Sequence, residues 1–381
     1  MENTTIKIVV VAGGTGGHLF PAMAVVEALE QLTGGSCSVD FIGTSTRIES
    51  TVVPRAGYRF HTIPATGLQK RLSLSAITFA LNMVRSVIRS RTLLLSLRPD
   101  IVLCAGAYIH YPVGFAASLL RIPLCIMQSN VYPGKAVLQL APKAQKIFTA
   151  FEETIKYLHP RSQQRAEVTG NPVRGSLTVL PEKQQARISM GLNPIKPTVL
   201  CFGGSLGANS INQVVEKSLR KFVDAGIQLI WQTGNFYMPA PENIPPEMTA
   251  IYPFIDDMAS AYAAADLIVC RAGATSIAEL CLTGKPAILV PYPHAANNHQ
   301  EINAKIMEHR KAAFVIADSQ LDSKLVYTII SLLTDREKLQ TMSENAKALA
   351  NEHAAKDIAR SILNFVQTQK QTGKTRSRQA T

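Results

Sequence analysis

The residues with the clearest capacity for chemistry are four glycines, a threonine and a histidine near the amino terminus. The apolar run 7–12 has the composition of a strand. The turn Gly13-Gly14-Thr15-Gly16-Gly17-His18 follows it, and residues 19–29 have the pattern of a helix that tolerates Pro21 in its first turn. Such a turn places bare backbone N–H groups at the positive end of the helix, which suits a phosphate or another oxyanion. His18 lies at the lip of the turn, and histidine is a common general base in enzymes.

The same pattern recurs about halfway along the chain. Residues 198–202 have the composition of a strand, Gly203-Gly204-Ser205-Leu206-Gly207-Ala208 forms a glycine-rich turn, and residues 209–221 have the pattern of a helix. Ser205 and the N–H groups near Gly207 are suited to hold a pyrophosphate. Two such turns indicate two phosphate-binding loops, one in each half of the chain.

Two charged residues add to a nucleotide site in the second half. Arg174 follows Gly170-Asn171-Pro172, near the junction of the halves, where it can neutralise a phosphate. Glu279 lies in the helix predicted after Arg271-Ala272-Gly273 and can accept hydrogen bonds from ribose hydroxyls. The chain has no Asp-x-Asp pair, so we expect no metal; helix N-termini, hydroxyl groups and arginine would stabilise a departing diphosphate.

Two common nucleotide-binding classes are disfavoured. A dinucleotide fingerprint needs Gly-x-Gly-x-x-Gly, but the spacing from Gly14 gives Gly16 and then Leu19. Gly43 ends the second predicted strand, where a dehydrogenase needs an acid for the ribose. The glycines are not followed by lysine and then serine or threonine, which argues against a P-loop.

Strands and helices alternate along the whole chain, which predicts parallel sheets covered on both faces. The repeated opening pattern predicts an α/β protein of two Rossmann-like, doubly wound domains that face each other across a cleft. We expect a first domain over 1–165 and a second over 166–366, whose last helix packs back on the first. We expect residues 367–381, which are basic and lack an apolar pattern, to be a disordered tail.

Positive charge is concentrated in the first half. Residues 50–151 contain twelve Lys and Arg and one acid, whereas residues 166–365 contain eighteen basic and nineteen acidic residues. A basic body predicts an anionic partner, which can be lipid headgroups, nucleic acid or a phosphorylated substrate. Aromatic residues for stacking on single strands are sparse, so we expect no nucleic acid.

A candidate membrane-contact segment lies within a helix predicted over 72–97. Its apolar stripe is flanked by Lys70, Arg71, Arg85, Arg89 and Arg91, and the apolar run 72–84 is too short to span a bilayer. We therefore expect reversible adhesion to an anionic membrane surface. The stripe consists of Leu72, Ala76, Phe79, Ala80, Met83 and Val87.

The six cysteines form no Cys-x-x-Cys pair and lie mostly in apolar runs, so we expect buried, reduced thiols. The first five residues lead into a strand without a secretory signal pattern. Both features are typical of a protein on the cytoplasmic side of the membrane.

Taken together and in order, the motifs closely resemble the MurG-type N-acetylglucosaminyltransferases of bacterial peptidoglycan synthesis. The matching segments are Gly13-Gly14-Thr15-Gly16-Gly17-His18 with Phe20-Pro21-Ala22, Gly170-Asn171-Pro172-Val173-Arg174, Gly203-Gly204-Ser205-Leu206-Gly207-Ala208, Ile255-Asp256-Asp257-Met258, Arg271-Ala272-Gly273-Ala274 and His299-Gln300 with Asn303-Ala304.

The resemblance implies a fold of two Rossmann-like domains and inverting transfer of GlcNAc from UDP-GlcNAc, a co-substrate, to the C4 hydroxyl of MurNAc-pentapeptide on undecaprenyl diphosphate (lipid I). It implies a peripheral enzyme on the cytoplasmic face of the bacterial membrane, with other cell-wall synthesis and division proteins as further partners. His18 would be the general base, and Gly14, Gly106 and Tyr108 would belong to the acceptor loops. The remaining roles are Thr15, Gly16 and Gly17 for the sugar and acceptor diphosphate; Asn130 and Gln300 for GlcNAc hydroxyls; Arg174, Ser205 and Ser276 for the donor diphosphate; the Ile255 backbone for uracil; and Glu279 for the ribose.

Two departures from the family pattern concern the acceptor side. The family usually has His-Glu-Gln-Asn where this chain has Met127-Gln128-Ser129-Asn130, and Gly-Gly-Tyr where it has Gly106-Ala107-Tyr108. A general base on the absent carboxylate is thereby excluded. Three alternatives remain: an enzyme resembling UDP-GlcNAc 2-epimerase, another glycolipid glycosyltransferase, and a catalytically silent scaffold that binds nucleotide sugars.

Overall fold

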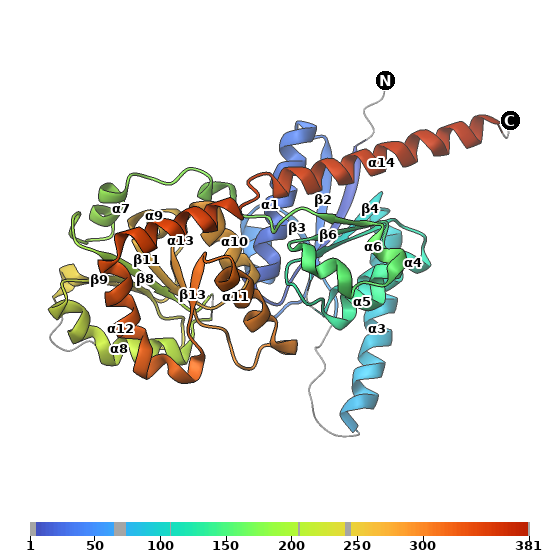
Figure 1. Cartoon of the computed structure of the whole chain (residues 1–381). Coiled ribbons are helices and arrows are strands. Elements are labelled where there is room, and N and C mark those ends of the chain that lie inside the picture. Colours follow the sequence, from blue (N-terminus) through green and yellow to red (C-terminus); the bar gives the residue numbers. More distant parts are fainter. Residues whose placement is uncertain (1–4, 65–73, 107, 205, 241–244, 380–381) are drawn as a thin grey trace. The chain divides into compact units, whose positions relative to one another are not determined.

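The computed structural model describes residues 5–64, 74–106, 108–204, 206–240 and 245–379. The chain forms two compact units, one of Met1–Pro172 with His353–Thr381 and one of Val173–Glu352 (Figure 1). Each unit contains its own parallel sheet covered by helices, which confirms the predicted class of two doubly wound α/β domains.

The first unit has a seven-stranded sheet in the order β3-β2-β1-β4-β5-β6-β7. Its strands are β1 (Ile6–Val11), β2 (Cys37–Gly43), β3 (Arg59–Thr62), β4 (Ile101–Cys104), β5 (Leu124–Gln128), β6 (Lys146–Thr149) and β7 (Ala166–Val168). Its helices are α1 (Gly16–Thr33), α2 (Glu49–Arg55), α3 (Leu74–Leu97), α4 (His110–Leu119), α5 (Lys135–Leu140), α6 (Pro160–Gln163) and α14 (Ala354–Gln379).

The second unit has a six-stranded sheet in the order β10-β9-β8-β11-β12-β13. Its strands are β8 (Thr198–Phe202), β9 (Gln228–Gln232), β10 (Thr249–Tyr252), β11 (Leu267–Cys270), β12 (Ala287–Leu289) and β13 (Ala313–Val315). Its helices are α7 (Lys183–Ser189), α8 (Asn209–Asp224), α9 (Met258–Ala264), α10 (Ala274–Thr283), α11 (His299–His309), α12 (Leu321–Thr334) and α13 (Arg336–Ala348).

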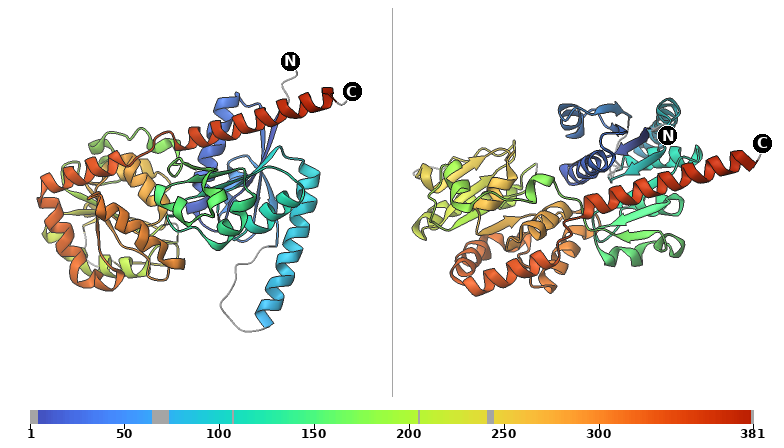
Figure 2. Two further views of the ribbon diagram at one scale, coloured as in Figure 1. Left: turned by 45° about the vertical axis from the view of Figure 1, so that its right-hand side comes forward. Right: turned by 90° about the horizontal axis from the view of Figure 1, so that it is seen from above.

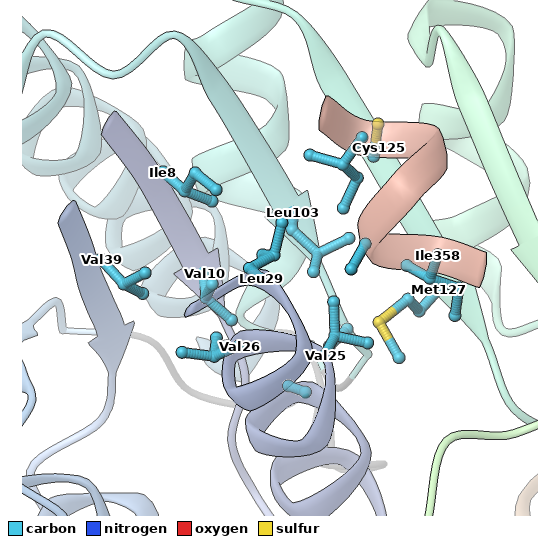
Figure 3. Close-up of a cluster of buried hydrophobic side chains, with 14 of the residues drawn as sticks. Ile8, Val10, Val25, Val26, Leu29, Val39, Leu103, Cys125, Met127 and Ile358 are labelled. Atoms are coloured by element: carbon cyan, nitrogen blue, oxygen red, sulfur yellow. The ribbon is translucent and has the colours of Figure 1, made fainter. Parts of the chain in front are cut away.

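Alternate residues of β1 supply the cores on the two faces of the first sheet, as the twofold period of a strand requires. Ile8 and Val10 pack in one cluster with Leu29 of α1 and Ile358 of α14 (Figure 3). Val9 and Val11 belong to the cluster on the opposite face, which α4 and α5 cover. Helices on both faces explain why β1 is apolar at nearly every position.

The carboxyl-terminal segment differs from its expected disorder. Helix α14 continues to Gln379, so residues 367–379 are helical, and the helix lies along the first unit beside α1 (Figure 2). Ile362 and Val366 are buried against the first sheet, and the ammonium of Lys370 lies 3.0 Å from a carboxylate oxygen of Asp100. Residues 367–379 are polar, so their composition does not indicate a helix. The apolar residues with which α14 packs on the sheet come before residue 367.

The boundary between the units also differs from the expectation. Strand β7 pairs with β6 and is the edge of the first sheet, so the first unit continues to Pro172 instead of ending at residue 165. Residues 353–366, expected in the second domain with the last helix packed back on the first, do pack on the first domain and belong to its unit, because α14 contributes to its core.

Two further features bear on the predictions. Helix α1 begins at Gly16, three residues earlier than expected, so His18 lies in its first turn and Pro21 in its second. All six cysteines are free thiols, and Cys37 alone among them is not fully buried. None of the helices within the described ranges is long and apolar enough to cross a membrane.

Candidate active site

In each sheet, the order in which the chain adds strands reverses at the first strand. The sequence motifs lie at these two reversals. The chain proceeds from β1 outward to β3 and resumes with β4 on the other side of β1; it likewise proceeds from β8 to β10 and resumes with β11. Open parallel sheets bind ligands beyond the carboxyl ends of the strands at such a reversal. The loops after β1, β4, β8 and β11 are therefore the candidate binding loops.

The first glycine-rich loop has the shape of an anion site. It turns at Gly14, where φ is +85°, a value that favours glycine. Thr15 is exposed and is the N-cap of α1; its carbonyl accepts hydrogen bonds from the N–H groups of His18 (3.2 Å) and Leu19 (3.3 Å). The positive end of an 18-residue helix therefore lies at Thr15, Gly16 and Gly17.

The structure brings His18 and Gly106 into contact within the first unit. A Cβ atom added to Gly106 would lie 2.2 Å from Cδ2 and 2.7 Å from Nε2 of the His18 ring. Gly106 also has φ of +113°, which L-residues rarely adopt. A glycine is thus required at this position on two counts, and it lets the imidazole of α1 pack on the loop after β4.

A second histidine, His110, adjoins this pair at the start of α4. It is 2% exposed, and neither of its ring nitrogens has a hydrogen-bond partner within the described ranges. Burial, and secondarily the nearby His18, lowers the pKa of His110 to about 3. His110 is therefore a neutral imidazole at physiological pH.

Tyr108, predicted for the acceptor loops, and Asn130, predicted for the GlcNAc hydroxyls, follow neighbouring strands. Tyr108 comes after β4 and Asn130 after β5, and both are half-buried. The Asn130 carbonyl accepts a hydrogen bond from Nε2 of Gln128 at 2.8 Å. Because β1, β4 and β5 are adjacent and parallel, the loops with Gly14, Tyr108 and Asn130 share one edge of the sheet.

The glycine-rich loop of the second unit is tightly packed against its neighbours. Gly207 has φ of +75°, and a Cβ there would lie 2.1 Å from the Thr233 carbonyl oxygen. The predicted Ser205 lies outside the described residues. The loop leads into α8, so its N–H groups lie at the positive end of a 16-residue helix.

One buried amide, Gln232, joins two predicted donor-side segments. Its Nε2 donates to the Gly204 carbonyl at 2.9 Å, and its Oε1 accepts from the Ile255 N–H at 3.0 Å. Gln232 is 3% exposed, at the end of β9. The N–H of Ile255 is thereby engaged, so an incoming base must share this N–H or use the Ile255 carbonyl.

Glu279 and Arg174 form an ion pair, although they lie 105 residues apart in the sequence. The distance from an Arg174 Nη2 to Glu279 Oε1 is 3.3 Å, and Tyr262 donates its hydroxyl to Oε2 at 3.0 Å. Burial raises the pKa of Glu279, and Arg174 and Tyr262 oppose this shift. The Arg174 side chain is 26% exposed, whereas that of Glu279 is 7% exposed.

The remaining predicted residues lie at helix starts. Ser276 is in the first turn of α10, and Gln300 is the second residue of α11. Oε1 of Gln300 accepts the Tyr292 N–H at 2.9 Å, which ties α11 to the loop after β12. Within the ranges that the structure describes, no three His, Cys, Asp or Glu side chains are grouped so as to hold a metal ion.

Comparison with known proteins identifies the family. Residues 8–149 match the glycosyltransferase family 28 N-terminal domain, and residues 198–362 match the glycosyltransferase family 28 C-terminal domain. A protein of Chlorobium luteolum named UDP-N-acetylglucosamine–N-acetylmuramyl-(pentapeptide) pyrophosphoryl-undecaprenol N-acetylglucosamine transferase is 39% identical over 95% of this chain and 100% of its own length.

The chain belongs to the MurG family of glycosyltransferases. The crystal structure of Acinetobacter baumannii MurG has a TM-score of 0.73 and 27% identity, covering 94% of this chain and 99% of that one. A putative UDP-N-acetylglucosamine 2-epimerase from Listeria monocytogenes has a TM-score of 0.67 over 95% of this chain and 96% of that one, but at 15% identity it shows the fold alone.

In this MurG-family chain, three residues organise the loops in a way that the sequence did not indicate: Gln232, Glu49 and Arg271. Arg271 is 8% exposed, and its guanidinium donates to the Ser210 hydroxyl at 2.8 Å and pairs with Asp318, so it joins the end of β11 to the start of α8. Glu49 accepts a hydrogen bond from the Gly14 N–H. A buried polar residue at the end of a strand is the signal that could have found Gln232.

Replacing Gly106 tests the contact with His18. We expect Gly106→Ala to displace the imidazole, because the new methyl group cannot occupy the space of the ring, and to cost about 1–3 kcal/mol of stability through backbone strain. The matched control is Gly57→Ala, where φ is +84° but nothing lies within 4 Å of an added Cβ. Histidine-selective NMR should show the His18 resonances moving in the first variant only; unchanged resonances in Gly106→Ala would contradict the contact.

Proposed function

We propose that this protein transfers GlcNAc from UDP-GlcNAc to the C4 hydroxyl of MurNAc-pentapeptide-diphosphoundecaprenol, converting lipid I to lipid II with inversion. The observation that carries the proposal is full-length membership of the MurG family, together with a glycine-rich loop at the strand reversal of each unit. In this reaction, the first domain binds the acceptor, lipid I, and the second domain binds the donor, UDP-GlcNAc.

On the acceptor side, Thr15, Gly16 and Gly17 bind the sugar and diphosphate of lipid I, with Gly14, Gly106 and Tyr108 shaping the loops. His18 takes the proton of the C4 hydroxyl as that oxygen attacks C1 of GlcNAc. The bond between C1 and the UDP oxygen breaks on the opposite face, which inverts the anomeric centre. The fixed position of the His18 ring over Gly106 supports this role, since a general base must be held within reach of its proton.

On the donor side, Arg174, Ser205 and Ser276 bind the diphosphate, and the N-termini of α8 and α10 stabilise the charge of departing UDP. The Ile255 backbone contacts uracil, Glu279 the ribose, and Asn130 and Gln300 the GlcNAc hydroxyls. The Arg174–Glu279 pair supports the assignment, because one guanidinium can hold both the carboxylate and a phosphate. UDP-GlcNAc is the co-substrate, and the mechanism requires no metal.

The first domain also meets an anionic membrane surface on the cytoplasmic face of the cell, where its lipid substrate lies. Helix α3 supports this: Leu81, Val84, Ile88 and Leu95 are 54%, 56%, 60% and 47% exposed, and Arg85 and Arg89 are exposed between them. Figure 2 shows the amino-terminal part of this helix extending beyond the rest of its unit. Other proteins of cell-wall synthesis and division are further candidate partners.

This apolar face differs in part from the predicted stripe. Val87 packs against the core of the first unit, and Met83 is half-buried, so neither is among the exposed apolar residues of this face. Leu72 lies outside the described residues. The buried positions Ser86, Ser90 and Leu94 mark the opposite side of the helix, which explains the shift of the exposed face by one residue.

The direct test measures the transfer of labelled GlcNAc from UDP-GlcNAc to a lipid I analogue by the wild-type protein and by His18→Ala. We expect the wild-type protein to form the lipid-linked disaccharide. His18→Ala should lower kcat by about 100-fold or more, within the usual contribution of general-base catalysis, and should leave the Kd for UDP unchanged. Conversion of UDP-GlcNAc in the absence of acceptor would indicate an epimerase. Binding of UDP-GlcNAc without transfer would indicate a silent scaffold. Equal losses of kcat and UDP affinity would reject His18 as the base.

The ribose assignment predicts a donor-specific effect. Glu279→Gln should weaken UDP binding about 10- to 100-fold, since a hydrogen bond to a charged group contributes about 1.5–3 kcal/mol. Tyr262→Phe is the matched control, because it removes only the hydroxyl bonded to Glu279 and should leave UDP affinity near wild type. Calorimetric titration measures both, with circular dichroism to verify folding; an unchanged Kd in folded Glu279→Gln would exclude the ribose role.

The membrane assignment predicts that Ile88→Glu reduces binding to anionic vesicles several-fold, because it places an acid in the exposed apolar face. Leu119→Glu, on α4 of the same unit and 58% exposed, is the control and should bind like wild type. Sedimentation with phosphatidylglycerol vesicles, at low and high salt, measures the effect. If vesicle binding changes neither with salt nor in Ile88→Glu, the membrane contact lies elsewhere on the protein.

A further inference from the structure

A buried carboxylate lies beneath the first glycine-rich loop. Oε2 of Glu49 accepts a hydrogen bond from the Gly14 N–H at 3.0 Å, and Oε1 accepts from the Thr44 N–H at 3.0 Å and from the Thr44 hydroxyl at 2.7 Å. Glu49 is fully buried and Thr44 is 5% exposed. The carboxylate therefore joins the loop after β1 to the loop after β2.

Two glycines make room for this side chain. A Cβ on Gly13 would lie 2.5 Å from Oε1 of Glu49, and a Cβ on Gly43 would lie 2.6 Å from its Cγ. Strands β1 and β2 run in register up to Val11 and Ile42, so both glycines come just where the strands end. Glu49 thus accounts for the need for glycine at 13, and Glu49 and the Phe60 ring, whose Cε2 would lie 2.6 Å from an added Cβ, account for it at 43.

The bonding of Glu49 is suited to a carboxylate and to no other side chain of its size. No ion pair among the described residues includes Glu49, so N–H and hydroxyl donors provide its partners. An ionised carboxylate accepts at both oxygens, whereas a glutamine amide accepts at one and donates at the other. Glutamine would therefore face one of the two N–H groups with its own N–H.

We propose that Glu49 is a positioning residue of the acceptor side, whose carboxylate fixes the direction of the Gly13–Gly17 loop and thereby the start of α1, which carries His18. Because the Gly14 N–H is bonded to Glu49, this N–H is not among the groups that the loop offers to an acceptor diphosphate. The catalytic part of this inference rests on the proposed transfer reaction; the placement of His18 does not.

Glu49→Gln is the decisive variant, because it keeps the size of the side chain and removes one acceptor. Misplacement of a catalytic group by about 1 Å can cost about 100-fold in rate. We expect kcat for transfer to the lipid I analogue to fall about 10- to 100-fold, with an unchanged Kd for UDP. Thr44→Val, which removes only the hydroxyl donor, should lie between, and Thr44→Ser should resemble wild type.

The matched control is Glu30→Gln in the same unit, where the carboxylate accepts a hydrogen bond from the Tyr58 hydroxyl at 3.0 Å. It should keep wild-type kcat. Rates are expressed per UDP-binding site, so that a loss of folded protein alone does not lower them. Wild-type turnover in Glu49→Gln, or equal losses of turnover and UDP affinity, would overturn the inference.

Histidine-selective NMR gives a readout that does not need turnover. We expect the His18 resonances to move in Glu49→Gln and to stay in place in Glu30→Gln. If the wild-type protein transfers no GlcNAc, the proposed function fails, yet the His18 resonances still decide the placement. Unmoved His18 resonances in Glu49→Gln would reject the positioning role.

Discussion

The glycine-rich loops after β1 and β8 are each held in shape by a buried side chain, Glu49 from the start of α2 and Gln232 from the end of β9. Glycine loops are mobile by default, and fixing the backbone of one residue costs about 1–2 kcal/mol. Glu49, after β2, bonds the loop after β1, and Gln232, at the end of β9, bonds the loop after β8. Because β2 and β9 are the equivalent neighbours of the two first strands, both units solve the same problem in the same place.

The two side chains hold opposite kinds of backbone group. Glu49 engages an N–H of its loop, whereas Gln232 engages the Gly204 carbonyl. The Gly204 carbonyl also accepts the Gly207 N–H at 2.9 Å, while in the first loop the N–H of Gly14 is committed to Glu49. Gln232 also bonds Ile255, so the segment proposed to contact the base and the segment proposed to contact the diphosphate share one amide.

Much of the fold follows from local sequence. The strands beside the reversals are continuous apolar runs that end at glycines, so β1, β8 and β11 and the class of fold could be predicted. Strands β10 and β13 could not, because they span only four and three residues and depend on pairing with β9 and β12. Helix α14 was obscured because its polar end depends on burial of Ile362 and Val366 upstream.

The site was less accessible to sequence reasoning, because its organising contacts are long-range. Motifs indicated His18, Arg174 and Glu279 as separate residues, but the contact of His18 with Gly106 and the pairing of Arg174 with Glu279 need the tertiary structure. Glu49 follows an unremarkable Thr-Arg-Ile run and has meaning only beside Gly14.

The return of α14 to the first unit makes the second unit an insertion within the first. On the ribosome, the six-stranded sheet is complete once residue 352 has emerged, whereas the earlier sheet still lacks Ile358 and Ile362 over one face. The unit synthesised first is therefore the last to be sealed. Until α14 has emerged, the uncovered valines and leucines of this core can bind chaperones or associate prematurely with other nascent chains.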